Sequence, residues 1–185
     1  SYLTYPWIRL VSRSRPLEGE VRVIRHFDDR LTRLWDGIKG KFAFAVRRDA
    51  AYLNWKYIQP PHVRYSAAVL EREGEAAGYV VYRHVQEPRG RVTLLVDFLT
   101  DPDDGAAMTT LLRWIDREAR AADSDKIRTF AMNEAFRKHL RKSGYYHVKS
   151  TMEFVAKVNA VDVPATFFSD TSRWHVTLGD SDQDR

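Results

Sequence analysis

The sequence predicts an α/β (α+β) fold, in which a mixed, mostly antiparallel twisted sheet carries helices on both faces. Three strand-like segments in a row precede the first long amphipathic helix, which indicates an antiparallel meander. A strand, a helix and another strand then follow, and this passage is typical of a parallel crossover. The 185 residues are 44% hydrophobic and 12% aromatic, which suits one packed domain, expected over 21–185.

The first part of the chain predicts an arm and two helices. Residues 1–20 hold prolines and a glycine among basic residues, and we interpret them as a linker or arm from a longer protein. Alternating residues over 21–25 predict a short strand. Asp28 or Asp29 can cap the helix that follows, and a second helix begins at Asp49 and is stopped by two prolines.

The middle of the chain predicts the meander and the crossover. Strands over 65–72 and 77–85 are separated by the turn sequence EGEA, and a third, apolar strand begins at Val92. A loop rich in aspartate then leads into an amphipathic helix over 105–121, and a strand is expected over 126–132. One more helix is expected to begin at Asn133 and end at Gly144. The last two segments predict the strands that finish the sheet, His147–Val158 and Trp174–Leu178.

Composition limits the functions to consider. The absence of cysteine excludes disulfides, thiolate metal sites and a cysteine nucleophile, and no other metal site is expected. No apolar run approaches the roughly 20 residues needed to span a bilayer, and the amino terminus lacks signal-peptide features. We therefore expect a cytoplasmic protein with no membrane contact. The net charge of +5 is concentrated in the first 50 residues, but no nucleic-acid motif accompanies it, so a nucleic-acid partner is not expected.

Three features over about residues 21–180 resemble the GNAT superfamily of N-acetyltransferases. One is the meander whose last strand feeds an amphipathic helix through a tight loop. Another is Asn133, followed eleven residues later by Gly144 and Tyr145. The third is the closing sequence WHVTLGDSD, which together with RDAAYLNWKY resembles the carboxy-terminal halves of tandem GNAT-like proteins from polysaccharide or peptidoglycan gene clusters.

The resemblance implies an acyltransferase that moves an acyl (acetyl) group from acyl-CoA to an amine acceptor. The acceptor would be a small molecule, an amino sugar or a peptide, and the partner an upstream GNAT-like domain or a second copy of the chain. Acetyl-CoA or another acyl-CoA would lie along the strand before the loop and at the amino terminus of the next helix. The residues implied to hold it are Phe98, Leu99, Thr100, Gly105, Ala106, Ala107, Thr109 and Asn133.

The loop departs from the family's phosphate-binding pattern, Arg/Gln-x-x-Gly-x-Gly/Ala. Asp104, Ala107 and Thr109 stand at its three defining positions. Asp101, Asp103 and Asp104 also bring negative charge beside an expected pyrophosphate, and like charges about 4 Å apart repel by about 1 kcal/mol even in water. The same aspartates suit helix capping equally well.

Asp97 is the candidate general base. It lies in an apolar strand and is expected to share a face with Thr93, Leu95 and Leu99. A carboxylate in such a run is costly to bury unless it is paired, and such groups often serve in catalysis. The alternative is that Asp97 accepts hydrogen bonds from a neighbouring loop or pairs with an arginine.

Other site residues follow with less support. His84 and His175 are second-line candidates for the base, and Leu140 replaces the tyrosine that many family members use to protonate the leaving thiolate. Aromatic side chains are expected to line the acceptor cleft or else to pack on the sheet: Tyr52, Trp55 and Tyr82.

Two other functions remain open. One is a non-catalytic GNAT-like half of a tandem protein, with a degenerate CoA loop. The other is a FemX-like transferase that uses aminoacyl-tRNA, which the basic segment 9–48 makes conceivable.

Overall fold

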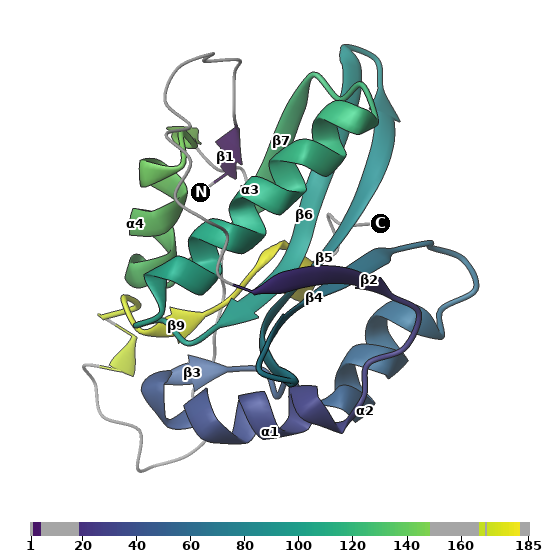
Figure 1. The fold of residues 1–185 in the computed structure, drawn as a ribbon. Helices are drawn as coiled ribbons and strands as arrows, with labels where there is room; N and C mark the ends of the chain where they lie inside the picture. The colour runs from purple at the N-terminus through teal and green to yellow at the C-terminus, as the bar shows by residue number, and fades with distance from the viewer. Residues whose placement is uncertain (1, 5–18, 149–166, 169, 182–185) are drawn as a thin grey trace.

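A seven-stranded sheet in the order β2-β4-β5-β6-β7-β1-β8 forms the middle of the molecule (Figure 1). The computed structural model describes residues 2–4, 19–148, 167–168 and 170–181. The strands of the sheet are β1 (Tyr2–Thr4), β2 (Glu20–Ile24), β4 (Ser66–Arg72), β5 (Glu75–Glu87), β6 (Gly90–Thr100), β7 (Lys126–Phe130) and β8 (Tyr146–Val148).

Every neighbouring pair in this sheet is antiparallel except β6 and β7. Those two are parallel because the helix α3 (Gly105–Ala121) returns the chain to the same end of the sheet. The predicted mixed, mostly antiparallel sheet and the three-strand meander are therefore confirmed.

Helices cover both faces of the sheet. α1 (Asp29–Ile38) and α3 both pack on β5, but on opposite sides of it. Tyr79 of β5 meets Phe27, just before α1, whereas Tyr82 meets Trp114 of α3, and both ring contacts are edge-on. None of the helices in the described ranges is long and apolar enough to cross a bilayer.

The short second helix changes type along its length. Asp49 caps α2 (Ala50–Leu53) by accepting a hydrogen bond from the Tyr52 N–H at 2.8 Å, as the sequence predicts. The chain then continues as a π-helix, η2 (Asn54–Ile58), up to the two prolines. Single π turns are rare and occur often at functional sites. The remaining helical elements are η1 (Lys39–Lys41), α4 (Glu134–Lys142) and η4 (Leu178–Asp180).

A β-bulge in β6 corrects the predicted strand face of Asp97. The register pairs Val81 with Asp97 and the next residue, Tyr82, with Leu95, so the ladder skips Val96. Because one extra residue reverses the alternation of side chains, Asp97 lies on the α1 face, whereas Leu95 lies on the α3 face with Tyr82. The prediction that Leu95 and Asp97 share a face is therefore wrong.

The two ends of the described chain also differ from expectation. Part of the predicted arm, Tyr2–Thr4, forms strand β1 between β7 and β8. The last strand, β9 (Trp174–His175), does not finish the main sheet but pairs in parallel with β3 (Phe44–Ala45). Only the start of the predicted strand His147–Val158 falls within the described residues.

Candidate functional site

β6 and β7 separate partway along β6. Their parallel ladder ends at the pair Leu95↔Thr129, although β6 runs further. The bulge at Val96 begins where the ladder stops, and a bulge bends the strand that carries it. We call the region between residues 96–100 and 131–133 the fork.

Residues 174–180, which we call the C-terminal segment, lie in the fork (yellow in Figure 1). Thr177 forms an antiparallel bridge with Ala131, just after β7. On the other side, Gly179 packs so closely beside Val96 that an added Cβ would touch its side chain. The chain's own backbone therefore fills the space between the two diverging strands.

Asp97 points from β6 into a buried polar cluster below the fork. Its side chain is fully buried. It accepts hydrogen bonds from the hydroxyls of Tyr57 at 3.1 Å, Tyr79 at 3.0 Å and Thr177 at 2.9 Å, and from the Phe98 N–H at 2.9 Å. Burial raises the pKa of both tyrosine hydroxyls, and the Asp97 charge raises it further, so both remain protonated donors.

Arg48 supplies the positive charge of this cluster. Its guanidinium is fully buried and reaches Asp97 through Nε at 3.2 Å and Asp180 through Nη2 at 2.6 Å. The Val46 carbonyl accepts a third hydrogen bond, at 3.0 Å. Burial by itself would lower the pKa of Arg48, but the Asp97 and Asp180 carboxylates raise it well above its ordinary value. One cation thus joins β6 to the C-terminal segment.

These contacts bear out the alternative interpretation of Asp97, in which it pairs with an arginine. Two carboxylates share one guanidinium, and Asp180 Oδ1 is buried with no hydrogen-bond partner among the described residues. Asp97 has no exposed surface, and its role as a general base stays a prediction.

His175 lies in an aromatic environment rather than in an open cleft. It is buried, and its ring stacks on Phe42 at 5.1 Å and meets Phe136 edge-on at 5.2 Å. Burial and the nearby Arg48 hold its pKa well below the usual range, while a hydrogen bond with the Phe98 backbone opposes this shift. His175 is therefore a neutral side chain packed against the β6 edge.

His84 lies at the other end of the sheet. It bonds the Thr93 hydroxyl at 2.9 Å, and Thr93 in turn donates to Ser124 at 2.8 Å. The structure does not bring it together with Asp97 or His175. No group of three or more acidic or histidine side chains in the described ranges is arranged to hold a metal ion.

The aspartates before α3 are all paired with cations. Lys41 binds Asp101 at 2.6 Å and Asp103 at 2.8 Å, and Arg72 binds Asp104 at 2.5 Å. The loop is therefore less negative than its sequence suggests, and the cations that neutralise it come from distant parts of the chain.

The first turn of α3 is already engaged by its own residues. Asp104 accepts a hydrogen bond from the Ala107 N–H at 2.9 Å, and the Thr109 hydroxyl donates to the Gly105 carbonyl at 2.7 Å. A Cβ at Gly105 would collide with the His139 ring. Ala106 lies between these contacts, at the second helical position.

The remaining residues expected to contact the cofactor lie inside the fold. Phe98, Leu99 and Thr100 have no exposed surface. Asn133 caps α4, where its side chain accepts a hydrogen bond from the Ala135 N–H at 3.0 Å. A direct role of these residues in cofactor binding stays a prediction.

The three aromatic residues proposed for the acceptor site are not together. Tyr82 is buried against α3, and its hydroxyl donates to Glu118 at 3.3 Å. Tyr52 and Trp55 form a ring pair 5.8 Å apart on the opposite side of the sheet. Trp55 is 63% exposed and lines a cavity of about 370 Å³.

Solved structures with a similar fold include N-acetyltransferases. Ribosomal-protein-alanine N-acetyltransferase from Brucella melitensis biovar Abortus 2308 superposes with a TM-score of 0.52 at 15% identity, over 75% of this chain and 99% of its own. The aminoglycoside acetyltransferase meta-AAC0020 from an uncultured soil metagenomic sample gives 0.51 at 10% identity, over 76% and 96%. The integron cassette protein HFX_CASS3 from the mobile metagenome of Cole Harbour Salt Marsh gives 0.51 at 18% identity, over 78% and 93%.

The chain has the GNAT fold. Identities this low establish the fold and not the reaction. No protein-family model and no curated protein matches the sequence.

The GNAT fold implies an acyl-CoA between the diverging strands, and the described residues could hold it there only after the C-terminal segment has left the fork. The His175 ring meets the Phe98 ring edge-on at 6.1 Å, beside the strand expected to pair with pantetheine. Thr177 takes the facing edge at Ala131. In this structure the C-terminal segment therefore takes the place expected for the pantetheine arm.

Sequence reasoning missed most members of the buried cluster. Arg48 looks like an ordinary surface residue beside Arg47, and Tyr57 and Tyr79 look like core aromatics. The available signal was Asp97 itself, because a carboxylate in an apolar strand requires partners. Nothing in local sequence identifies an arginine 49 residues away as one of them.

Proposed function

We propose that this chain is a GNAT-type acyltransferase domain that moves an acyl (acetyl) group from acyl-CoA to an amine acceptor. The observation that carries the proposal is the parallel pair β6 and β7, which separates next to the amino terminus of α3. One structural neighbour is named as an N-acetyltransferase and another as an aminoglycoside acetyltransferase, which supports the same reaction class.

The proposal requires the C-terminal segment to leave the fork. Acyl-CoA would supply the activated acyl thioester, and Phe98–Thr100 together with the first turn of α3 would hold it. The acceptor is proposed to be a small molecule, an amino sugar or a peptide. A cytoplasmic location and an upstream GNAT-like domain or second copy remain parts of this proposal.

A second candidate is a non-catalytic GNAT-like half of a larger protein. The specific observation in its favour is the filled fork, held by the ion pair between Arg48 and Asp180 and by the hydrogen bond from Thr177 to Asp97. Under this interpretation the C-terminal segment never leaves the fork, and the domain has a structural role in the larger protein instead of a catalytic one.

One titration separates the two candidates. Isothermal calorimetry with acetyl-CoA is carried out on the wild type and on Thr177→Ala, which removes one hydroxyl that ties the segment to Asp97. Acyl transfer predicts binding that is tighter in T177A than in the wild type, because the segment and the cofactor compete for one site. Release of free thiol in the presence of an amine then reports turnover.

The control is the folded state of the variant, monitored by near-UV circular dichroism. If T177A keeps its fold and neither protein binds acetyl-CoA at about 1 mM, which corresponds to about 4 kcal/mol of binding free energy, acyl transfer by this chain is excluded. That result would leave the non-catalytic half as the function.

A further inference from the structure

A cavity of about 370 Å³ lies beside the π-helix η2, away from the fork. This volume falls in the range of small-molecule sites, roughly 300–1,000 Å³. The residues that line it come from η2, from the loop before β4 and from the position just after the C-terminal segment: Trp55, Lys56, Gln59, Pro60, His62, Val63, Tyr65 and Ser181.

The π turn arranges this cavity. It directs Tyr57 inward, where the hydroxyl donates to Asp97, and leaves Trp55 on the outside at 63% exposure. Tyr65 closes the floor by meeting the Tyr57 ring edge-on at 5.2 Å. The buried cluster therefore fixes the wall of the cavity, and a large aromatic face is left without cover at its rim.

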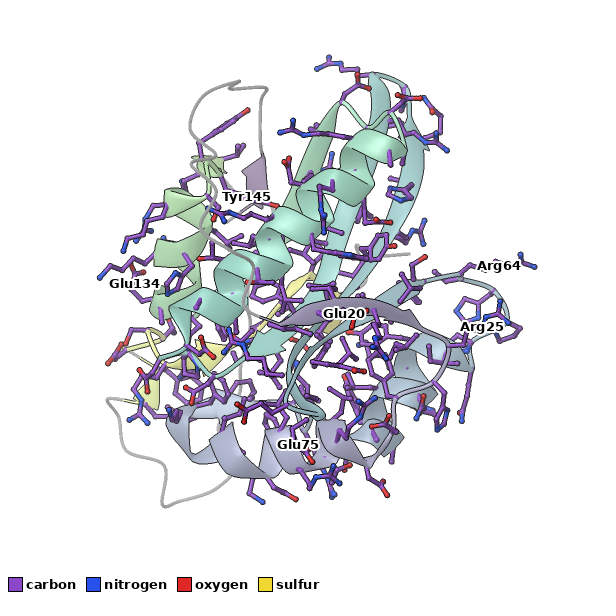
Figure 2. All side chains as sticks on the ribbon, viewed as in Figure 1. Glu20, Arg25, Arg64, Glu75, Glu134 and Tyr145 are labelled. Atoms are coloured by element: carbon purple, nitrogen blue, oxygen red, sulfur yellow. The ribbon has the colours of Figure 1, made fainter. Side chains whose placement is uncertain are left out.

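The cavity is lined by basic side chains, Lys56 and His62, and, among the described residues, by no acidic ones. Arg64, next in the loop, lies at the same end of the molecule as Arg25 in Figure 2. No carboxylate in the described ranges forms an ion pair with Lys56, Arg25 or Arg64.

Lys56 Nζ lies over the Tyr52 and Tyr57 rings, at 5.9 and 5.8 Å from their centroids, but this lack of carboxylate partners contrasts with the neighbouring surface. Arg30 is paired with Glu71 at 2.9 Å, and Arg33 is paired with Glu75 at 2.8 Å. Arg30 and Arg33 on α1 are thus neutralised, whereas the basic residues around the cavity have no carboxylate partner in the part of the chain that the structure describes.

We infer that the cavity binds a small anion that carries a ring. The ring lies against the exposed face of Trp55, and the phosphate or carboxylate group is held by Lys56 and His62, because charge-assisted hydrogen bonds are the strongest that such side chains make. The inference does not rest on acyl transfer, since the cavity and its charges exist with the fork filled.

The test is calorimetric titration at low salt with four probes. Glucose 6-phosphate and AMP carry both an anion and a ring, glucose lacks the charge, and inorganic phosphate lacks the ring. Binding of either ring-bearing phosphate, at least about 10-fold tighter than both glucose and phosphate, is expected. Whichever of the two binds more tightly identifies the ring as a sugar or a nucleoside.

Two variants and a matched control locate the site. Trp55→Ala and Lys56→Gln should each weaken binding by about 10-fold or more, because each removes one of the two recognition elements. Lys138→Gln removes an equal charge from an exposed position on α4 and should leave the affinity unchanged. Equal weakening by K138Q and K56Q would reduce the effect to net charge and overturn the inference.

Two further outcomes would also overturn it. The first is binding of glucose 6-phosphate and AMP no tighter than that of inorganic phosphate. The second concerns Asp182 and Asp184, which follow Ser181 in the sequence. If Asp182→Asn/Asp184→Asn raised the affinity more than about 10-fold, the anion of the cavity would be the chain's own tail.

Discussion

Arg48 and Asp97 form an ion pair that has no contact with solvent. Such a pair repays the cost of removing two charges from water only if hydrogen bonds satisfy the remaining atoms. Here tyrosine and threonine hydroxyls supply those bonds on the Asp97 side. The cluster therefore specifies how β6 and the C-terminal segment are arranged, and its net contribution to the free energy of folding is smaller than the attraction between the charges.

Replacement of Arg48 should strongly destabilise the folded protein. Arg48→Met leaves Asp97 and Asp180 buried without a counter-charge, so we expect the free energy of unfolding to fall by about 3–5 kcal/mol, measured by urea denaturation. Arg33→Met, which removes an exposed ion pair with Glu75, is the control and should leave stability unchanged. Equal effects of the two substitutions would contradict the structural role given to Arg48.

His175 should make stability depend on pH. Its folded pKa lies well below the unfolded value of about 6.5, so the contribution is complete above pH 6.5 and is lost as the pH falls, when only the unfolded chain takes up the proton. We expect stability to fall by about 1.4 kcal/mol per pH unit below pH 6.5 from this residue alone.

The measurement is urea denaturation of the wild type and His175→Asn between pH 7.5 and pH 5. The variant should show a flatter dependence, and an exposed control, His147→Asn, should keep the wild-type slope. A parallel slope in H175N and the wild type would show that His175 gains its proton equally in both states.

At the scale of elements, the loop before α3 acts as a helix cap with paired charges. Asp104 accepts the Ala107 N–H and also binds Arg72. The side chain of Asp103, one residue earlier, is 80% exposed and is paired with Lys41 at 2.8 Å. The two neighbouring aspartates therefore differ in what they stabilise.

Asp104→Ala should lower the free energy of unfolding by about 1–2 kcal/mol, because it removes the cap and a partly buried ion pair. Asp103→Ala should have no measurable effect on the thermal unfolding midpoint. If D103A were as destabilising as D104A, the loop charges as a group, and not the cap, would set the stability of α3.

The elements that could be predicted are those whose signals are local. α3 has an apolar stripe and a cap, and the hairpin of β4 and β5 has its turn residues, so both were predicted to within a few residues. The bulge at Val96 could not be predicted, because alternation in an apolar run does not show an extra residue. For the same reason the predicted face of Asp97 is wrong, although its unusual place in an apolar strand is evident from the sequence.

At the scale of the whole molecule, the fold followed from the order of elements, but the content of the fork did not. The sequence WHVTL fits a strand, and nothing in it identifies β3 and Ala131 as its partners rather than a sheet edge. The cavity shows the same division. The sequence predicts that Trp55 either lines an acceptor cleft or packs on the sheet, whereas it does not show that Lys56 and His62 lie beside the same cavity.

The position of the C-terminal segment has a consequence for synthesis. Arg48 and Asp180 are separated by 132 residues, and β3 pairs with β9, which lies a similar distance further along the chain. While the ribosome is still making the chain, Arg48 and Asp97 lack the groups that complete their cluster, and the edges of the fork remain open. Contacts this distant form slowly. The domain therefore acquires its final core only after Asp180 has emerged, and until then its apolar strand edges are open to chaperones.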